Sequence, residues 1–283
     1  MLADRMSTSF TKERVIRPKS GLVPIDFREL WRYRELFWFL AWRDILIRYK
    51  QTVIGIAWAV IRPIVTMIVF TIIFGKLAKL PSDGIPYPLL SFTALLPWQF
   101  FSNALTESSN SLVANANMIS KIYFPRLVIP ASAVISGIVD FLLCFVILLA
   151  LMLWYGVIPS YHILWLPPFF FLALFCSLGI GLWFSALNVE YRDVRHVVPF
   201  FVQFGLYVSP VGFSSSIIPE KWRLLYSLNP MVGVIDGFRW ALLGGKVTLY
   251  LPGLLMSSFM ILIVLVSGAY YFRKMESTFA DVI

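Results

Sequence analysis

The sequence predicts an all-α polytopic membrane protein, and three observations lead to that fold class. Hydrophobic residues make up 59% of the 283-residue chain, charged residues only 14%, and the mean hydropathy is +0.79. Soluble domains carry roughly a quarter charged residues, so this composition excludes a lone soluble enzyme, a nucleic-acid-binding protein and a disordered chain. Six apolar stretches approach the roughly 20 residues that a membrane-spanning helix needs. Because backbone in lipid must satisfy its own hydrogen bonds, helices are predicted.

The predicted organisation places a six-span transmembrane domain between two tails. Residues 1–25 form a cytoplasmic tail, 26–51 an amphipathic interface helix, 52–272 the transmembrane domain and 273–283 a second cytoplasmic tail. The spans are predicted at about 52–75, 86–110, 130–155, 163–188, 197–217 and 249–272, with short external helices at about 219–244.

The basic residues predict the orientation of the chain. Six spans place both termini on one side, and 17 of the 24 Lys and Arg residues lie on that side, against six on the other. The positive-inside rule therefore predicts that both termini are cytoplasmic and that the protein lies in the cytoplasmic (inner) membrane. The charged first 35 residues lack a signal-peptide pattern.

The interface helix is predicted from a mixture of basic and aromatic residues. Asp26 and Glu29 form an N-terminal capping pattern, and the Arg residues that follow are interleaved with Trp31, Trp38 and Trp42. The apolar stretch is too short to span, so this helix is expected to lie in the plane of the interface. It either anchors the chain on lipid or also docks a cytoplasmic partner.

Two further short segments are predicted outside the spans. The link Ser108–Arg126 is polar but barely charged, and a short helix within it would end before Pro125. This link is either a capped helix extension or a protruding element that meets another protein. In the external stretch, Pro219 and Gly244 bracket two short helices that cannot span. Such helices are typical of a re-entrant pair or an external gate.

Two ionisable residues, Arg62 and Asp140, lie inside predicted spans. Each is ten residues from the cytoplasmic end of its span, which gives both a depth of about 15 Å. We therefore hypothesise that they form an intramembrane pair, because charges at depth are usually paired. A stabilising pair and a proton relay are both possible roles, and Arg62 can snorkel if its span begins later.

An aromatic stripe follows one face of the fifth span. Phe200, Phe204, Tyr207 and Val211 recur at helical spacing. The stripe faces lipid or the core, or it lines a pore for sugars, whose rings offer apolar faces beside hydroxyl groups. Periodicity alone does not separate these readings.

Motifs for catalysis or cofactor binding are missing from the sequence. Gly244-Gly245-Lys246 is followed by Val and lacks the earlier glycine of a phosphate-binding loop. No metal-ligating or paired-carboxylate cluster is seen, so no catalytic, metal or cofactor-binding residue is predicted. Any energy source is expected to come from a partner.

Several segments together resemble one family, the permease subunits of ABC exporters for polysaccharides such as O-antigen, capsule and teichoic acid. The resemblance covers roughly residues 26–283. It is carried by Leu96–Phe101, Asn117–Leu127, Tyr191–Arg195 with Pro199, Ser209–Val211, Leu228–Gly244 and Phe279–Ile283.

The resemblance implies a homodimer with two copies of a separate ABC ATPase subunit, and no nucleic-acid partner. The interface helix and the link after span two would face the ATPases, while spans one, two and five would enclose a channel that the external helices gate. The residues expected to couple to the ATPase are Asn115, Asn117, Lys121 and Tyr123. Those expected to line the channel are Trp58, Trp98, Phe200, Phe204 and Tyr207. Those expected in the external gate are Tyr226, Asn229, Arg239 and Trp240.

The function expected from the sequence is ATP-driven export of a lipid-linked polysaccharide through a channel that this non-enzymatic subunit forms in membrane lipid. One alternative is a small-molecule or drug exporter permease of the same architecture. The other is a membrane enzyme of glycan assembly, which would need a cluster of charged groups in the external stretch. Only Glu220 and Asp236 are acidic there.

Overall fold

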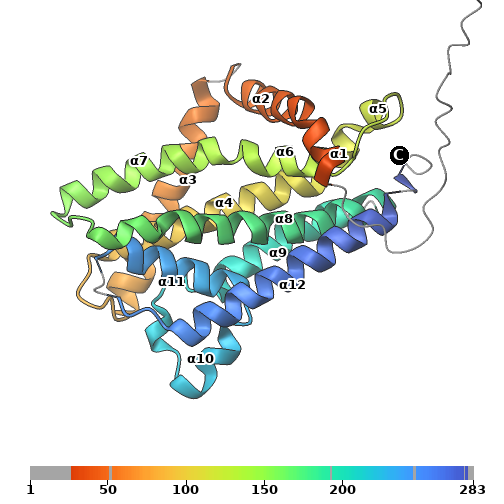
Figure 1. The fold of residues 1–283 in the computed structure, drawn as a ribbon. Helices are drawn as coiled ribbons and strands as arrows, with labels where there is room; N and C mark the ends of the chain where they lie inside the picture. Colours follow the sequence, from red (N-terminus) through yellow and green to blue (C-terminus); the bar gives the residue numbers. More distant parts are fainter. Residues whose placement is uncertain (1–26, 51–52, 192, 245–246, 277, 280–283) are drawn as a thin grey trace, which may run out of the picture.

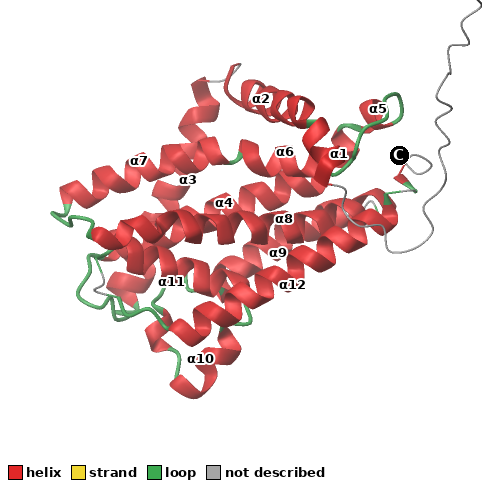
Figure 2. Ribbon diagram, in the orientation of Figure 1, coloured by secondary structure: helices red, strands yellow, loops and turns green. Residues whose placement is uncertain are grey.

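The part of the chain that the computed structural model describes comprises residues 27–50, 53–191, 193–244, 247–276 and 278–279, and it contains helices and no strand (Figure 2). The predicted all-α class is confirmed. The predicted 1–25 tail, the Asp26 cap and residues 280–283 lie outside the described residues. The helices are α1 (Phe27–Arg32), α2 (Arg34–Lys50), α3 (Val53–Phe70), η1 (Thr71–Leu77), α4 (Tyr87–Ala114), α5 (Ala116–Ile119), α6 (Val128–Ser136), α7 (Ile138–Trp154), η2 (Tyr161–Trp165), α8 (Leu166–Glu190), α9 (Val194–Val208), η3 (Ser215–Ile217), α10 (Glu220–Tyr226), α11 (Pro230–Leu242) and α12 (Leu251–Met275).

Three long helices, α4, α8 and α12, pack together, with α8 between the other two (Figure 1). Helix α8 packs extensively on both of the others. A Cβ on Gly179 of α8 would lie 2.7 Å from Leu265 Cα of α12, and one on Gly268 would overlap the Gly179 carbonyl oxygen. Because only glycine allows backbones to approach so closely, α8 and α12 are held together as one pair.

Four helical segments among the described residues are long and apolar enough to cross a membrane: Ala57–Leu77, Val128–Trp154, Tyr161–Glu190 and Leu251–Met275. They correspond to predicted spans one, three, four and six, which agrees with a polytopic membrane protein. Helix α4 has 28 residues, but its second half is rich in buried serines, and Ser108 fits against Gly181 of α8. The six-span count and the domain limits remain predictions.

Several predicted spans differ in detail from the helices. The first continues to Leu77 through a π-helical turn, and the third is divided at Gly137 into α6 and α7. The fifth ends at Val208, because Pro210 follows and the chain from Ser209 to Ser214 is not helical. Helix α9 therefore has 15 residues and is about 22 Å long, shorter than a hydrocarbon core of about 30 Å.

The predicted interface helix consists of α1 and α2. Helix α2 lies at one end of the bundle and packs on α6, near α5 (Figure 1). It buries Leu40 and Ala41, whereas Trp38, Phe39 and Trp42 are each more than 60% exposed. We call this end of the molecule the α5 end, and the opposite end, where α10 lies, the α10 end.

Candidate functional site

A polar groove of about 200 Å³ lies between the last turn of α2 and helices α3, α4 and α7. Gln99, Asn103 and Glu107 line it from α4, and their spacing of four places them on one face of that helix. Trp58 and Arg62 line it from α3. An aromatic ring, two amides and charged groups thus share one groove, which can hold a molecule that has both apolar faces and hydroxyl groups.

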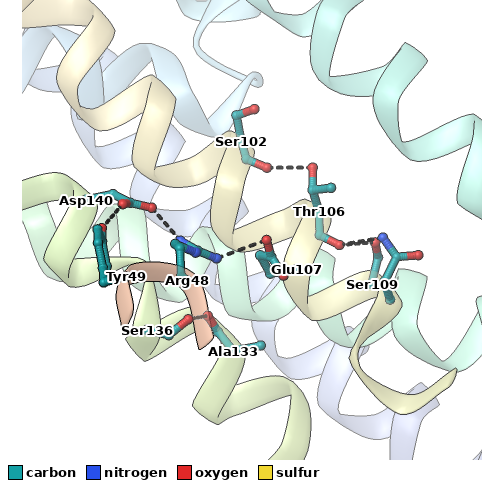
Figure 3. A network of polar contacts seen from close by, with 10 residues as sticks. Arg48, Tyr49, Ser102, Thr106, Glu107, Ser109, Ala133, Ser136 and Asp140 are labelled. Carbon is teal, nitrogen blue, oxygen red and sulfur yellow. Dashed lines mark hydrogen bonds and ion pairs between the residues drawn. The ribbon is translucent and has the colours of Figure 1, made fainter. Parts of the chain in front are cut away.

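Arg48 is the centre of the charged part of this groove (Figure 3). Its guanidinium contacts Asp140 (Nη1 to Oδ2, 2.5 Å) and Glu107 (Nη2 to Oε1, 2.9 Å). The Tyr49 hydroxyl donates a hydrogen bond to the other carboxylate oxygen of Asp140. The Asp140 side chain is 9% exposed and that of Glu107 54% exposed. Asp140 therefore depends on these partners, because a buried charge without one is costly.

The structure departs from the predicted pair of Arg62 and Asp140. Arg62 is exposed and lines the same groove, but Asp140 pairs with Arg48 instead. The reason is that the last turn of α2 brings Arg48 to α7, across 92 residues of sequence. Counting depth along two spans does not detect a third element that reaches the same carboxylate. Arg48, Tyr49 and Glu107 are thus site residues that sequence reasoning missed.

The predicted channel-lining residues fall into two groups. Phe200, Phe204 and Tyr207 are 70%, 60% and 59% exposed on α9, and Trp58 is 61% exposed on α3. The rings of Phe200 and Phe204 stack with centroids 6.2 Å apart. Trp98, in contrast, is 4% exposed and lies against Gly205, where a Cβ would be 2.8 Å from its ring. Trp98 is therefore buried against α9. Its neighbour Gln99, which lines the groove, is more exposed than Trp98.

At the α10 end, Arg239 holds the non-helical chain that follows α9. Its side chain is fully buried and donates to three carbonyl oxygens: those of Phe213 (2.8 Å), Val211 (3.1 Å) and Leu90 (3.4 Å). The Tyr87 hydroxyl of α4 donates to the Gly212 carbonyl oxygen between them. Backbone that leaves a helix loses its internal partners, and these side chains supply new ones.

Tyr226 and Asn229 hold the beginning of the same break. The Tyr226 hydroxyl donates to the Val208 carbonyl oxygen (2.8 Å), and the Asn229 amide donates to Ser209 Oγ (2.9 Å). Burial raises the pKa of Tyr226, and the charge of Asp236 raises it further, so the hydroxyl keeps its proton and remains a donor. Asn229 also caps α11 by accepting from the Met231 N–H.

The four predicted gate residues are thus not equivalent. Tyr226, Asn229 and Arg239 converge on the segment 208–213. Trp240 faces the other way, with its ring 4.4 Å from that of His162 in η2. The first three form a connected set that fixes the end of α9, and Trp240 is part of the packing between α11 and η2.

The predicted coupling residues lie at the α5 end. Asn115 is half-buried at the end of α4, where its side chain donates to the Ser111 carbonyl oxygen (2.8 Å). Asn117, Lys121 and Tyr123 are exposed, Tyr123 by 81%. The base of the same element is buried through Ile119 and Phe124. Exposed side chains on a segment that is fixed by buried residues suit contact with another protein. Asn115 instead caps the end of α4.

Residue types that bind metals do not converge in the described part of the chain. There, no group of three or more His, Cys, Asp or Glu side chains could hold a metal ion. Cys144 and Cys176 are free thiols buried in the apolar core. His162 shares a hydrogen bond with Ser160. The groups that do converge are the charged, amide and aromatic side chains of the groove.

Comparison with known proteins identifies the family. Residues 35–243 match the model of the ABC-2 type transporter family. The chain belongs to this family. It is 32% identical to the O-antigen export system permease protein RfbA of Klebsiella pneumoniae over 85% of this chain and 92% of that protein. Identity is 28% to RfbA of Myxococcus xanthus, over 75% and 82% of the two chains. It is 26% to the polysialic acid transport protein KpsM of Escherichia coli, over 73% and 80%.

The charged centre of this ABC-2 transporter predicts unequal effects for its two carboxylates. We expect Asp140→Ala to lower the free energy of unfolding by about 3 kcal/mol, because it leaves Arg48 and Tyr49 without their buried acceptor. Glu107→Gln removes the more exposed partner and should cost about 0–1 kcal/mol. Thermal unfolding of the detergent-solubilised protein measures both. Equal shifts for the two variants would contradict this account.

The buried guanidinium of Arg239 predicts local opening when it is replaced. In Arg239→Met, and also in Arg239→Lys, which lacks the fork of donors, we expect amide hydrogens of residues 211–214 to exchange roughly a hundredfold faster, the equivalent of about 3 kcal/mol. Hydrogen exchange with mass spectrometry checks this, and Lys221→Met on the exposed side of α10 is the control. Unchanged exchange in both Arg239 variants would rule out the role given to this residue.

Proposed function

We propose that this chain is the channel-forming transmembrane subunit of an ATP-driven exporter that moves a lipid-linked polysaccharide across the cytoplasmic membrane. The observation that carries the proposal is the exposed aromatic face of α9, with Trp58 on α3, in an ABC-2 transporter whose relatives are named for O-antigen export and polysialic acid transport. Aromatic rings offer flat apolar surfaces to sugar rings, and the groove amides offer partners to sugar hydroxyls.

The energy is proposed to come from a separate ABC ATPase subunit, present in two copies. The exposed tip formed by Asn117, Lys121 and Tyr123 supports such a docking site. The α5 end then faces the cytoplasm, together with both termini, as the distribution of basic residues predicts. ATP is bound by the partner, and this chain supplies no catalytic residue.

The working unit is proposed to be a homodimer in the inner membrane. One copy offers only one wall, because Phe200, Phe204 and Trp58 are exposed rather than enclosed. A second copy that faces this wall would complete a channel between the two. Helix α2 then lies at the lipid surface, where its exposed Trp38 and Trp42 accompany Arg43 in the way that interfacial helices combine aromatic and basic residues.

The proposed transport cycle follows from this arrangement. The lipid-linked end enters from the cytoplasmic leaflet beside α2, and the groove between α3 and α4 receives the first sugars. Sugar rings then pass along the aromatic face of α9. ATP binding by the partner displaces residues 115–126, called the α5 element below. The segment 208–213 with α10 and α11 then opens the external side.

The proposal predicts that the aromatic face of α9 is needed for export. We expect Phe204→Ala to reduce surface glycan by roughly fivefold, the effect of about 1 kcal/mol on a binding constant. Phe259→Ala is the matched control, because Phe259 is a phenylalanine of equal exposure (59%, against 60% for Phe204) on α12. Surface glycan is measured in a deletion strain that carries each variant, with the amount of membrane protein measured in parallel.

Three outcomes separate the proposal from its alternatives. Loss of surface glycan in the deletion strain, its return with the intact chain and a selective effect of Phe204→Ala support glycan export. Unchanged surface glycan with a new sensitivity to small toxic compounds indicates the drug-exporter alternative. Accumulation of unextended or unligated glycan precursors outside the membrane indicates an enzyme of glycan assembly.

A further inference from the structure

The base of the α5 element is tied to the chain that follows α12. The backbone N–H of Arg126 donates to Glu276 Oε1 (3.0 Å), and the Arg126 guanidinium donates to the Glu276 carbonyl oxygen. The other carboxylate oxygen of Glu276 accepts from Arg273 Nη1 (2.6 Å). Glu276 thus connects two segments that are 150 residues apart in sequence.

Phe279 strengthens this connection by burial. Its side chain is fully buried, and its ring centroid lies 5.3 Å from that of Phe272 in α12. The Arg126 guanidinium lies over the Phe279 ring, 5.9 Å from its centroid. Phe279 belongs to a buried cluster that also contains Leu40 of α2 and Ile119 of α5. The cluster therefore joins the interface helix, the α5 element and the end of α12 in one apolar unit.

At its other end, α12 is connected to α10 and α11 (residues 220–242), called the external segment here. Ser257 Oγ donates to the Ser227 carbonyl oxygen (2.9 Å) and accepts from the Gly233 N–H of α11 (3.1 Å). In between, Gly179 and Gly268 hold α12 tightly to α8. Helix α12 has 25 residues and is about 37 Å long, so one stiff element reaches from the α5 element to the α10–α11 segment.

We propose, on the basis of the export function proposed above, that Glu276 and Phe279 are positioning residues that latch the α5 element to α12, so that a displacement of this element by the ATPase moves the α8–α12 pair and, through it, the external segment. The latch gives a role to Phe279, the first residue of the terminal motif. It also gives the external segment a mechanical connection to the α5 end that does not run through α9.

The latch predicts that its loss uncouples ATP hydrolysis from export. In Glu276→Ala and in Phe279→Ala, we expect the transporter to co-purify with its ATPase and to hydrolyse ATP within about twofold of the intact complex, while surface glycan falls by roughly tenfold. Glu276→Gln keeps an acceptor for the Arg126 N–H, and Phe279→Leu keeps an apolar side chain, so both should recover most of the export. Thr278→Ala, an exposed neighbour with only a local hydrogen bond, is the control.

The measurements distinguish the latch from a merely structural role. Surface glycan that stays unchanged in both alanine variants overturns the proposal, and so does a parallel fall of complex, ATP hydrolysis and export. Should the alanine variants fail to accumulate, the two conservative variants decide: a ratio of export to ATP hydrolysis measurably below that of the intact complex supports the latch, and a ratio equal to it overturns the proposal. A deletion strain that keeps its surface glycan would instead refute the export function itself, before any variant is compared.

Discussion

The absence of hydrogen-bond partners in lipid hydrocarbon is the constraint on which the rest of this structure depends. A helix meets it by bonding to itself, but any break in a helix, and any charge at depth, needs a partner from elsewhere in the chain. Arg239 supplies that partner for the chain that follows α9, by donating to carbonyl oxygens of Val211 and Phe213. Arg48 supplies it for the buried carboxylate of Asp140. The helix break and the buried charge are therefore both places where distant elements meet, and both border surfaces proposed to serve transport.

This constraint also divides the molecule into stiff and adjustable parts. The α8–α12 pair leaves no room for a side chain at Gly179 and Gly268, so the two helices are tightly packed along their contact. The polar connections lie at its two ends, where Glu276 meets Arg126 and Ser257 meets α11. An apolar rod with polar contacts at both ends can transmit a displacement while its middle remains in lipid. The arrangement would thus link the proposed ATPase at the α5 end to the segment at the α10 end without a polar path through the bilayer.

The sequence predicted the parts of this account that depend on local pattern. Long apolar runs predicted the all-α class, and the motifs predicted the relationship to permeases of polysaccharide-exporting ABC transporters. Pro219 and Gly244 predicted the short helices of the stretch between them. The contacts between distant elements were not predictable in this way. Asp140 was assigned to Arg62 because both lie at one depth, whereas Arg48 reaches it from a helix outside the spans. Trp98 was assigned to the channel by residue type, but burial beneath Gly205 depends on how α9 packs on α4.

The central claim is that this chain is a passive conduit worked by a separate ATPase. Reconstitution in lipid vesicles tests it most directly: the purified chain, alone or with its ATPase, is supplied with a lipid-linked glycan, and transfer of the glycan across the bilayer is followed with and without ATP. We predict transfer only when the chain, the ATPase and hydrolysable ATP are all present. Transfer by the chain alone, or transfer that does not depend on ATP, would contradict the account.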